Sequence, residues 1–541
     1  MRVLIFHGYL LRGTGSNVYN ASLAPALARL GHEVHLLCQD RAAGELDWVD
    51  SVGGEGRPGA VTVHVPEIGG LLPVYVLDSY EGFEVQAFSE LDVAELDRYL
   101  QANVAAVTDV IARAGPPDAA LANHLVMGPA ILARAGLRFA AKVHGSALEY
   151  TVKADPERFL PFAREGMEAA SAVLVGSRHT AESLWEAIDM PALPAKTRLG
   201  PPGVDTTLFS PIPPEEGRDR LRDLAVDVRT GLGGELGEDE TAHPRVARTG
   251  AFPEAELSGR KSGDAPARRQ DPRPSAWGRN PEQASAAIDW FADAEGPRVV
   301  FVGKLIVSKG VDLLLAAWPL AATRNPGARL LLVGFGEYRD GLDRLWRALG
   351  AGDHADATEI AARGRALEGG PESRLRMLAS FLKAPPAGYA EAAAAAADSV
   401  RFSGRLEHDE VGRLLPATEA LVFPSTFPEA FGMVAAEAAA AGVLPVSADH
   451  SGLAEVSREL AGALEPDLRE LVSFELGTGA VAAIAGRLDR WLATDELTRE
   501  RARAALAETA AGLWGWEGVA RGVIAASQGR IDELAQVPAG R

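Results

Sequence analysis

Short apolar runs alternate with longer amphipathic segments along the first 210 residues. Apolar residues at helical spacing predict helices at Ala21–Leu30, Val93–Ala114 and Met127–Ala135. The runs between them predict buried strands at Val3–Phe6, Val34–Leu37, Val61–Val65, Ala119–Leu121, Ala141–Val143 and Ala172–Val175. Strands that alternate with helices predict a mainly parallel sheet that is covered on both faces.

The same alternation begins again in the second half of the chain. Helices are predicted from Gly310–Pro319 and at Val434–Ala441, where alanine dominates. The predicted strands are Val299–Val302, Leu330–Val333, Ser399–Phe402, Ala420–Phe423 and Leu444–Val446. The chain therefore contains two α/β regions, and the fold class is α/β.

Composition separates these regions from other kinds of segment. Residues 211–296 are rich in Arg, Pro, Gly and Asp and contain few large apolar residues, which predicts a partly disordered insertion. We therefore expect one domain at 1–210 and another at 297–500, with a helical pair inserted at 338–398. Residues 501–541 predict a helical tail with large apolar anchors, and we expect this tail to dock on the N-terminal domain.

Charge and cysteine content narrow the function classes. The 541 residues include 54 Lys and Arg against 74 Asp and Glu, so the formal net charge is −20. Such a chain repels nucleic acid and anionic lipid unless cations gather locally, which leaves peripheral membrane contact open. The lone Cys38 excludes an internal disulfide. Because no apolar run approaches the roughly 20 residues of a membrane span, we expect a soluble, cytoplasmic protein.

A glycine-rich loop follows the first strand and precedes a helix. Gly13 and Gly15 would allow a phosphate to approach amide groups at the helix N-terminus. The dinucleotide-binding fingerprint has a third glycine at the position that Val18 occupies here. Asp40, however, follows the second strand, where that fingerprint has its ribose-binding acid. The loop therefore fits a phosphate site, a structural turn or a nicotinamide-nucleotide site.

The strongest local motif surrounds the alanine-rich helix. Glu429 lies just before the helix, where a carboxylate can accept hydrogen bonds from hydroxyl groups. The amides of Gly432, Met433 and Val434 open the helix at the positive end of its dipole and suit a diphosphate. Glu437 is suited to a ribose diol, because a carboxylate on a buried helix needs partners.

These motifs resemble the family 4 retaining glycosyltransferases of the GT-B superfamily, which are also called glycosyl transferases group 1. The resemblance rests on stretches that occur in the family's order and cover nearly the whole chain apart from the two insertions. They are the glycine-rich loop, Val143–Ser146, Pro202–Asp205, Phe301–Leu314, Leu332–Glu337, Val400–Leu406, Glu429–Glu437, Gly442–Val446 and Ser451–Val456.

The resemblance implies a GT-B fold, in which two Rossmann-like domains face each other across a cleft. It also implies that the N-terminal domain binds the acceptor and the C-terminal domain the nucleotide sugar. Glu429 would then bind hydroxyls of the transferred sugar, and Glu437 would bind the ribose. His144 matches the family's active-site histidine, which contacts the donor sugar.

The resemblance further implies which groups hold the donor diphosphate. Lys304, Lys309 and the amides of Gly432–Val434 would bind it, and Gly15 would approach it from the opposite domain. These cations and amides would replace the divalent metal of other glycosyltransferases, and no His and carboxylate cluster has metal-ligand spacing. Position 304 is Lys where the family commonly has Arg. A lysine ammonium would contact the diphosphate as a point charge, whereas an arginine guanidinium would bind it as a planar fork.

The base of the nucleotide would lie against Arg405 and Leu406, and Phe431 completes the predicted donor site. His124 and Arg178, each after a strand, fit either the cleft or an ordinary structural position. We therefore expect a metal-independent, retaining hexosyltransferase without a cofactor, acting on a nucleoside diphosphate sugar and an unidentified acceptor. The alternatives are a GT-B epimerase or phosphorylase, an NAD-dependent oxidoreductase, and a silent carbohydrate-binding protein.

Overall fold

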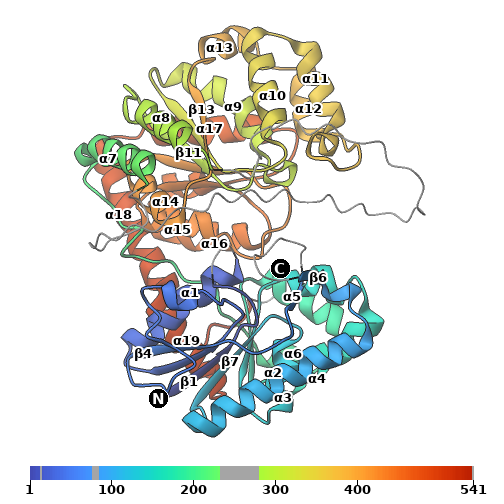
Figure 1. The fold of residues 1–541 in the computed structure, drawn as a ribbon. Helices are drawn as coiled ribbons and strands as arrows, with labels where there is room; N and C mark the ends of the chain where they lie inside the picture. The colour runs from blue at the N-terminus through green and yellow to red at the C-terminus, as the bar shows by residue number, and fades with distance from the viewer. Residues whose placement is uncertain (12–14, 76–83, 232–278, 539–541) are drawn as a thin grey trace. The chain divides into compact units, whose positions relative to one another are not determined.

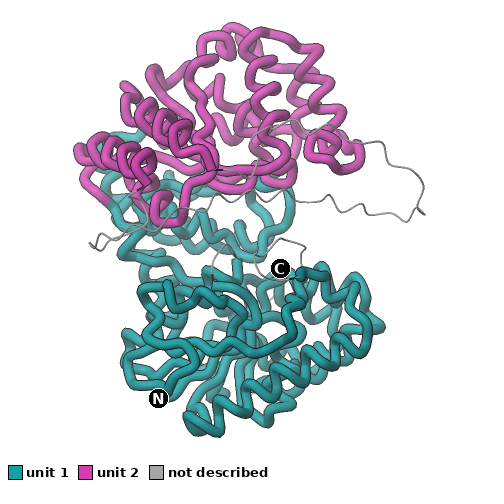
Figure 2. Tube along the Cα trace, in the orientation of Figure 1, with its two compact units in different colours: residues 1–211, 425–476, 493–541 teal, residues 212–424, 477–492 magenta. Residues whose placement is uncertain are grey.

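The computed structural model describes residues 1–11, 15–75, 84–231 and 279–538, and the chain divides into two compact units (Figures 1 and 2). Unit 1 comprises residues 1–211, 425–476 and 493–541, and unit 2 comprises residues 212–424 and 477–492. The predicted 297–500 domain therefore contributes residues to both units. Gly13, and residues 232–278 of the predicted insertion, lie outside the described residues.

Unit 1 is built on an eight-stranded parallel sheet with the strand order β10-β9-β8-β7-β1-β2-β4-β3. Its strands are β1 (Arg2–Phe6), β2 (Glu33–Leu37), β3 (Ser51–Val52), β4 (Ala60–His64), β7 (Ala119–Asn123), β8 (Ala140–Val143), β9 (Ala172–Val175) and β10 (Thr197–Leu199). A separate two-stranded sheet consists of β5 (Leu71–Val74) and β6 (Glu84–Ala87). The sequence predicted six of the main strands, to within one or two residues at most ends.

The helices of unit 1 come from both ends of the chain and from residues 425–476. They are α1 (Ser16–Arg29), α2 (Val93–Ala114), α3 (Gly128–Arg134), α4 (Pro156–Ala169), α5 (Arg178–Ile188), α6 (Leu193–Lys196), α15 (Met433–Ala440), α16 (Ser451–Ala463), α18 (Glu496–Trp514) and α19 (Trp516–Ser527).

Side chains of the central strand alternate between two apolar clusters. Val3 and Ile5 join a cluster that includes residues of α1 and α19, while Leu4 and Phe6 join one that includes residues of α2 to α5. This is the period-two pattern of a strand buried on both faces. The C-terminal helix α19 thus packs against α1 and β7 and helps to cover the N-terminal sheet (Figure 1).

A second sheet has six strands in the order β13-β12-β11-β14-β15-β16. The strands are β11 (Arg298–Val302), β12 (Arg329–Val333), β13 (Val400–Gly404), β14 (Ala420–Phe423), β15 (Leu444–Ala448) and β16 (Ser473–Phe474). The remaining helices, all in unit 2, are α7 (Gly217–Thr230), α8 (Pro281–Ala292), α9 (Val311–Arg324), α10 (Arg339–Ala351), α11 (His354–Arg363), α12 (Arg376–Lys383), α13 (Tyr389–Ala395), α14 (His408–Leu414) and α17 (Ala480–Leu492).

Two sequence expectations for unit 2 can be compared with the structure. In the segment 211–296, which was expected to be partly disordered, α7 and α8 occupy the two ends and pack on each other, while the expectation for residues 232–278 stays a prediction. Leu221, Leu224 and Val228 of α7 are fully buried, so the charged residues between them lie on the other side of an amphipathic helix. The expected helical pair at 338–398 is a set of four helices, α10 to α13.

Among the described residues, no helix combines the length and the apolar character needed to cross a membrane.

Candidate active site

The loop that carries Glu429 connects β14 to α15, and the start of α16 holds it in place. The Ser425 hydroxyl donates to Glu429 Oε1 at 2.7 Å, and the Glu429 amide donates to Ser451 Oγ at 2.9 Å. The Gly452 amide donates to the Glu429 carbonyl at 2.9 Å. The carboxylate is half-buried, so it is oriented by the loop and still reachable from solvent.

Two glycines allow other chain segments to approach this loop closely, and a third glycine lies in ordinary contact with it. A Cβ atom on Gly176, after β9, would lie 2.9 Å from the Ala430 carbonyl oxygen, and one on Gly452 would lie 2.6 Å from Phe431 Cα. A Cβ on Gly145, after β8, would lie 3.8 Å from Ala430 Cβ. The Glu429 loop is therefore packed against the loop after β9 and the start of α16, and it lies beside the loop that begins with His144, all within unit 1.

The N-terminus of α15 lies directly after this loop. Gly432 has a φ of 153°, a conformation that favours glycine, and a Cβ there would lie 2.9 Å from Leu453 Cδ2. The first amides of the helix, at Met433 and Val434, have no acceptor within the helix and are half-buried. Glu437 is only 5% exposed, on the buried part of α15.

The side chain of Phe431 has a structural role that the sequence did not indicate. Its ring is 8% exposed and meets the Trp514 ring of α18 edge to face, with the centroids 5.6 Å apart. This packing and the close approach of Gly452 to the Phe431 backbone fix the start of α15.

His144 directly follows β8 and is half-buried. Its Nε2 lies 2.8 Å from Asn123 Oδ1 at the end of β7. Tyr19 meets its ring edge to face, with the centroids 5.1 Å apart. Burial and the neighbouring His124, Lys142 and His7 hold the pKa of His144 well below its usual range, so the imidazole is neutral at pH 7.

His124 follows β7 and lies among aromatic rings. Its ring is 2% exposed, and its centroid lies 4.6 Å from that of Tyr75 and 5.2 Å from that of His144. Neither ring nitrogen has a hydrogen-bond partner among the described residues. Burial lowers the pKa of His124 well below its usual range. It packs beside His144 as a neutral ring.

The two lysines and the predicted base contacts lie in unit 2. Lys304 is exposed after β11, and the Lys309 ammonium lies 5.1 Å from the centroid of the Phe423 ring. The Arg405 guanidinium lies 5.8 Å from the centroid of Phe335, and Leu406 is 8% exposed. These residues occupy the loops that follow β11 and β13, which are the carboxyl ends of parallel strands.

The nicotinamide alternative requires Asp40 to bind a ribose, but the Asp40 carboxylate accepts hydrogen bonds from nearby main-chain amides. Its Oδ2 accepts from the Leu11 amide at 3.2 Å and its Oδ1 from the Ala42 amide at 3.0 Å. The carboxylate is 6% exposed, so it joins the ends of β1 and β2 and does not present oxygens to a ribose. Gly15 is exposed with a φ of 64° and opens α1.

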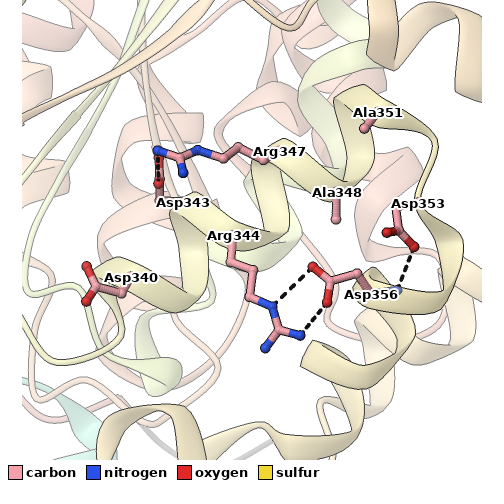
Figure 3. Close-up of a pocket in the computed structure, with 8 residues that line it drawn as sticks. All are labelled: Asp340, Asp343, Arg344, Arg347, Ala348, Ala351, Asp353 and Asp356. Carbon is pink, nitrogen blue, oxygen red and sulfur yellow. Dashed lines mark hydrogen bonds and ion pairs between the residues drawn. The ribbon is translucent and has the colours of Figure 1, made fainter.

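A cavity of about 630 Å³ lies elsewhere, on α10 and α11 of unit 2 (Figure 3). Its charged residues pair with one another: Arg347 with Asp343 at 2.6 Å, and Arg344 with Asp356. None of the predicted site residues lines it. This cavity is therefore a feature of the inserted helices.

The structure thus brings together the His144 and Glu429 loops with the start of α15 in unit 1, and keeps the lysines with Arg405 in unit 2. No sequence pattern singled out His7, Asn20 and Asn123, which a chain of hydrogen bonds connects to His144. Asn20 near the start of a helix and Asn123 at the end of a strand are ordinary positions for asparagine. Only their contact in the folded protein indicates a link to His144.

Family models match two regions of the chain, one that contains His144 and one that contains Glu429. Residues 14–203 match the model described as a glycosyl transferase 4-like domain, and residues 390–505 match the glycosyl transferases group 1 model. The chain therefore belongs to the family 4 glycosyltransferases of the GT-B superfamily, as the sequence motifs implied.

Individual relatives agree with this family. A glycogen synthase of Mycobacterium tuberculosis is 29% identical over 174 residues, which cover 31% of this chain and 31% of that protein. A glycogen synthase of Halorhodospira halophila is 48% identical over 59 residues, or 10% of this chain and 12% of that protein. The chain thus spans less than a third of the length of these curated relatives.

Solved structures establish the fold. The sucrose-phosphate synthase of Thermosynechococcus elongatus has a TM-score of 0.50 at 18% identity, covering 98% of both chains. Anabaena HepE, in complex with UDP and glucose, has a TM-score of 0.51 at 15% identity, covering 97% of this chain and 98% of that one. The predicted GT-B fold with two Rossmann-like domains is confirmed.

Proposed function

We propose that this protein transfers a glycosyl group from a nucleoside diphosphate sugar to a hydroxyl group of an acceptor, with retention of the anomeric configuration. The observation that carries the proposal is that the Glu429 loop and the loop that begins with His144 are neighbours within unit 1, where Gly145 lies beside Ala430. Glu429 and His144 match the family motif, and membership of the family supports glycosyl transfer.

In this proposal the two side chains bind the transferred sugar. Glu429, oriented by Ser425 Oγ, accepts hydrogen bonds from sugar hydroxyls, and its negative charge favours the positive charge that develops on the sugar ring. His144 is neutral, so it contributes a hydrogen bond without adding positive charge beside that ring. Glu437 binds the ribose diol.

The leaving diphosphate is stabilised by cations and amides. Lys304, Lys309 and the amides of Met433 and Val434 bind its oxygens, and they oppose the negative charge that grows as the bond to the sugar breaks. The anomeric carbon–oxygen bond breaks while the acceptor oxygen attacks the same face of the sugar. The acceptor proton passes to the departing phosphate oxygen, which balances the reaction without a divalent metal.

A donor panel tests this proposal. Purified protein is incubated with UDP-, ADP-, GDP- and dTDP-sugars, with and without EDTA, and the released nucleoside diphosphate is quantified. We expect release from at least one donor at an unchanged rate in EDTA, and mass spectrometry of added acceptors should find a product heavier by one glycosyl residue. Absence of both binding and release across the panel would refute the proposal.

A further inference from the structure

A chain of hydrogen bonds runs from His144 into the interior of unit 1. His144 Nε2 lies 2.8 Å from Asn123 Oδ1, and Asn123 Nδ2 donates to Asn20 Oδ1 at 2.8 Å. Asn20 Nδ2 lies 3.0 Å from His7 Nδ1, and His7 Nε2 lies 3.1 Å from Asn17 Oδ1. The chain connects the ends of β1, β7 and β8 with helix α1, and its asparagines are buried.

Main-chain carbonyl groups fix the direction of this chain. Asn123 Nδ2 also donates to the Phe6 carbonyl at 3.2 Å, and Asn20 Nδ2 donates to the Ser16 carbonyl at 2.8 Å. A carbonyl oxygen only accepts, so turning either amide over would place two oxygens face to face. Each amide nitrogen is therefore assigned by its main-chain partner, and the Oδ1 of Asn123 is the atom that faces His144.

The protonation of both histidines follows from that direction. Because Asn123 Oδ1 only accepts, His144 Nε2 must carry the hydrogen. Because the amide nitrogen of Asn20 donates to His7 Nδ1, His7 carries its hydrogen on Nε2, which donates to the Leu10 carbonyl at 3.0 Å. Burial lowers the pKa of His7 to about 4, so this ring is also neutral at pH 7.

We propose that Asn123, Asn20 and His7 are positioning residues that hold His144 in the Nε2–H tautomer and present its Nδ1 lone pair to a donor-sugar hydroxyl. The role toward the sugar rests on the proposed function; the tautomer does not. No hydrogen bond engages His144 Nδ1 within the described part of the chain, so this atom is the acceptor that the chain leaves available. All the bonds point the same way, which polarises each of them.

Four titratable side chains lie around His144, and the carboxylate nearest in sequence to the neighbouring Ala430 is Glu429. The four are His7 after β1, His124 after β7, Lys142 within β8 and Tyr19 of α1. No carboxylate is among the groups that shift the pKa of His144. The tautomer is therefore set by Asn123, without the negative partner that orients many active-site histidines.

The tautomer is measured directly by nitrogen-15 NMR of the full-length protein labelled at histidine. The chain has 11 histidines, so His144→Gln and His7→Gln assign the two signals by loss. At pH 7 we expect the His144 signal of a protonated Nε2 and a bare Nδ1. A protonated Nδ1 or a cationic ring in the wild-type protein would overturn the proposal, whether or not any donor is turned over.

Two variants test the origin of the tautomer. Asn123→Ala removes the acceptor, and we expect the His144 signals to shift toward a mixture of both tautomers. Asn20→Asp keeps an acceptor for Asn123 but replaces the donor to His7 with a carboxylate, and we expect the hydrogen of His7 to move to Nδ1. Unchanged nitrogen signals in both folded variants would contradict the proposal.

Kinetics complete the test. We expect Asn123→Ala to lower kcat about 100-fold with a KM for the donor within a few-fold of wild type, because the ring loses its productive orientation. Asn103→Ala is the matched control, since Asn103 is equally buried in α2 but lies outside the chain of hydrogen bonds. If Asn103→Ala lowers kcat as much as Asn123→Ala, the effect is one of packing and the positioning role is wrong.

Discussion

The carboxylate of Glu429 combines orientation with access, because Ser425 Oγ holds one oxygen while the side chain stays half-buried. Glu429→Gln keeps the size and one acceptor oxygen but removes the negative charge. We expect kcat to fall at least about 100-fold, since the charge acts most strongly in the transition state. The measurement is steady-state release of nucleoside diphosphate.

The control for this variant is Glu459→Gln, an exposed carboxylate on α16 of the same unit. It should retain wild-type turnover, and both variants should unfold at the wild-type temperature. Wild-type turnover by Glu429→Gln would remove this residue from the active site.

Lys142 gives a second residue-scale prediction, for stability against pH. It is 2% exposed in β8 and donates to the Gly200 carbonyl, and burial lowers its pKa to about 7. The unfolded chain keeps this group protonated to about pH 10, so between pH 7 and 10 the unfolded state binds more protons. The free energy of unfolding must therefore rise with pH across that window.

Urea denaturation of the wild-type protein and of Lys142→Met checks this sign. From pH 7 to pH 9 the wild-type protein should gain about 2 kcal/mol of unfolding free energy relative to the variant. A parallel pH dependence in the two proteins would show that Lys142 has an ordinary pKa.

Residue-scale chemistry was only partly predictable from the sequence. Glu429 and His144 stand in motifs whose spacing identifies them, and the roles assigned to them are still predictions. Asn20 and Asn123 have no such spacing, because they meet only when β1 lies between β2 and β7 and α1 packs on the same sheet. A network of this kind depends on the fold, and no local pattern encodes it.

At the scale of elements, helix α19 makes the clearest prediction. Trp516 is 6% exposed and meets the Tyr19 ring edge to face at 5.4 Å. A Cβ on Gly203 would lie 2.4 Å from its indole, so the ring rests directly on that backbone. Trp516→Ala should lower the free energy of unfolding by about 3–5 kcal/mol, because the cavity it leaves cannot fully collapse.

Leu513→Ala serves as the control, since Leu513 lies three residues earlier and is 48% exposed. Its cost should stay below about 1 kcal/mol. Equal losses from the two substitutions in urea denaturation would mean that α19 does not stabilise the N-terminal sheet.

Element prediction missed helices where composition outweighed periodicity. The Arg, Pro, Gly and Asp content of 211–296 hid the helix α7, although Leu221, Leu224, Ala225 and Val228 repeat at helical spacing. All four are buried, and α8 supplies the partner surface. The buried strands were easier to predict because a short apolar run on a two-sided sheet has few alternatives.

At the scale of the whole molecule, a protein with a net charge of −20 should repel an anionic donor. In the proposed function, cations near the diphosphate offset this repulsion, and one of them, Lys309, lies in the loop after β11. Lys309→Ala should lower kcat/KM for the donor about 100-fold, because one cation at the leaving diphosphate is lost. Donor-dependent release of nucleoside diphosphate measures this effect.

Lys383→Ala removes the same charge from the end of α12, in the same unit, and should leave kcat/KM unchanged. If both variants lose activity equally, overall charge and not a local contact governs donor binding.

The most direct test of the central claim is the anomeric configuration of the product. Proton NMR of the product of the wild-type reaction, formed from the best donor of the panel with EDTA present, reads the coupling of the anomeric proton at the new glycosidic bond. We predict the same configuration as in the donor. A product with the inverted configuration would contradict retaining glycosyl transfer. Product formation that continues in Glu429→Gln would contradict transfer at this site.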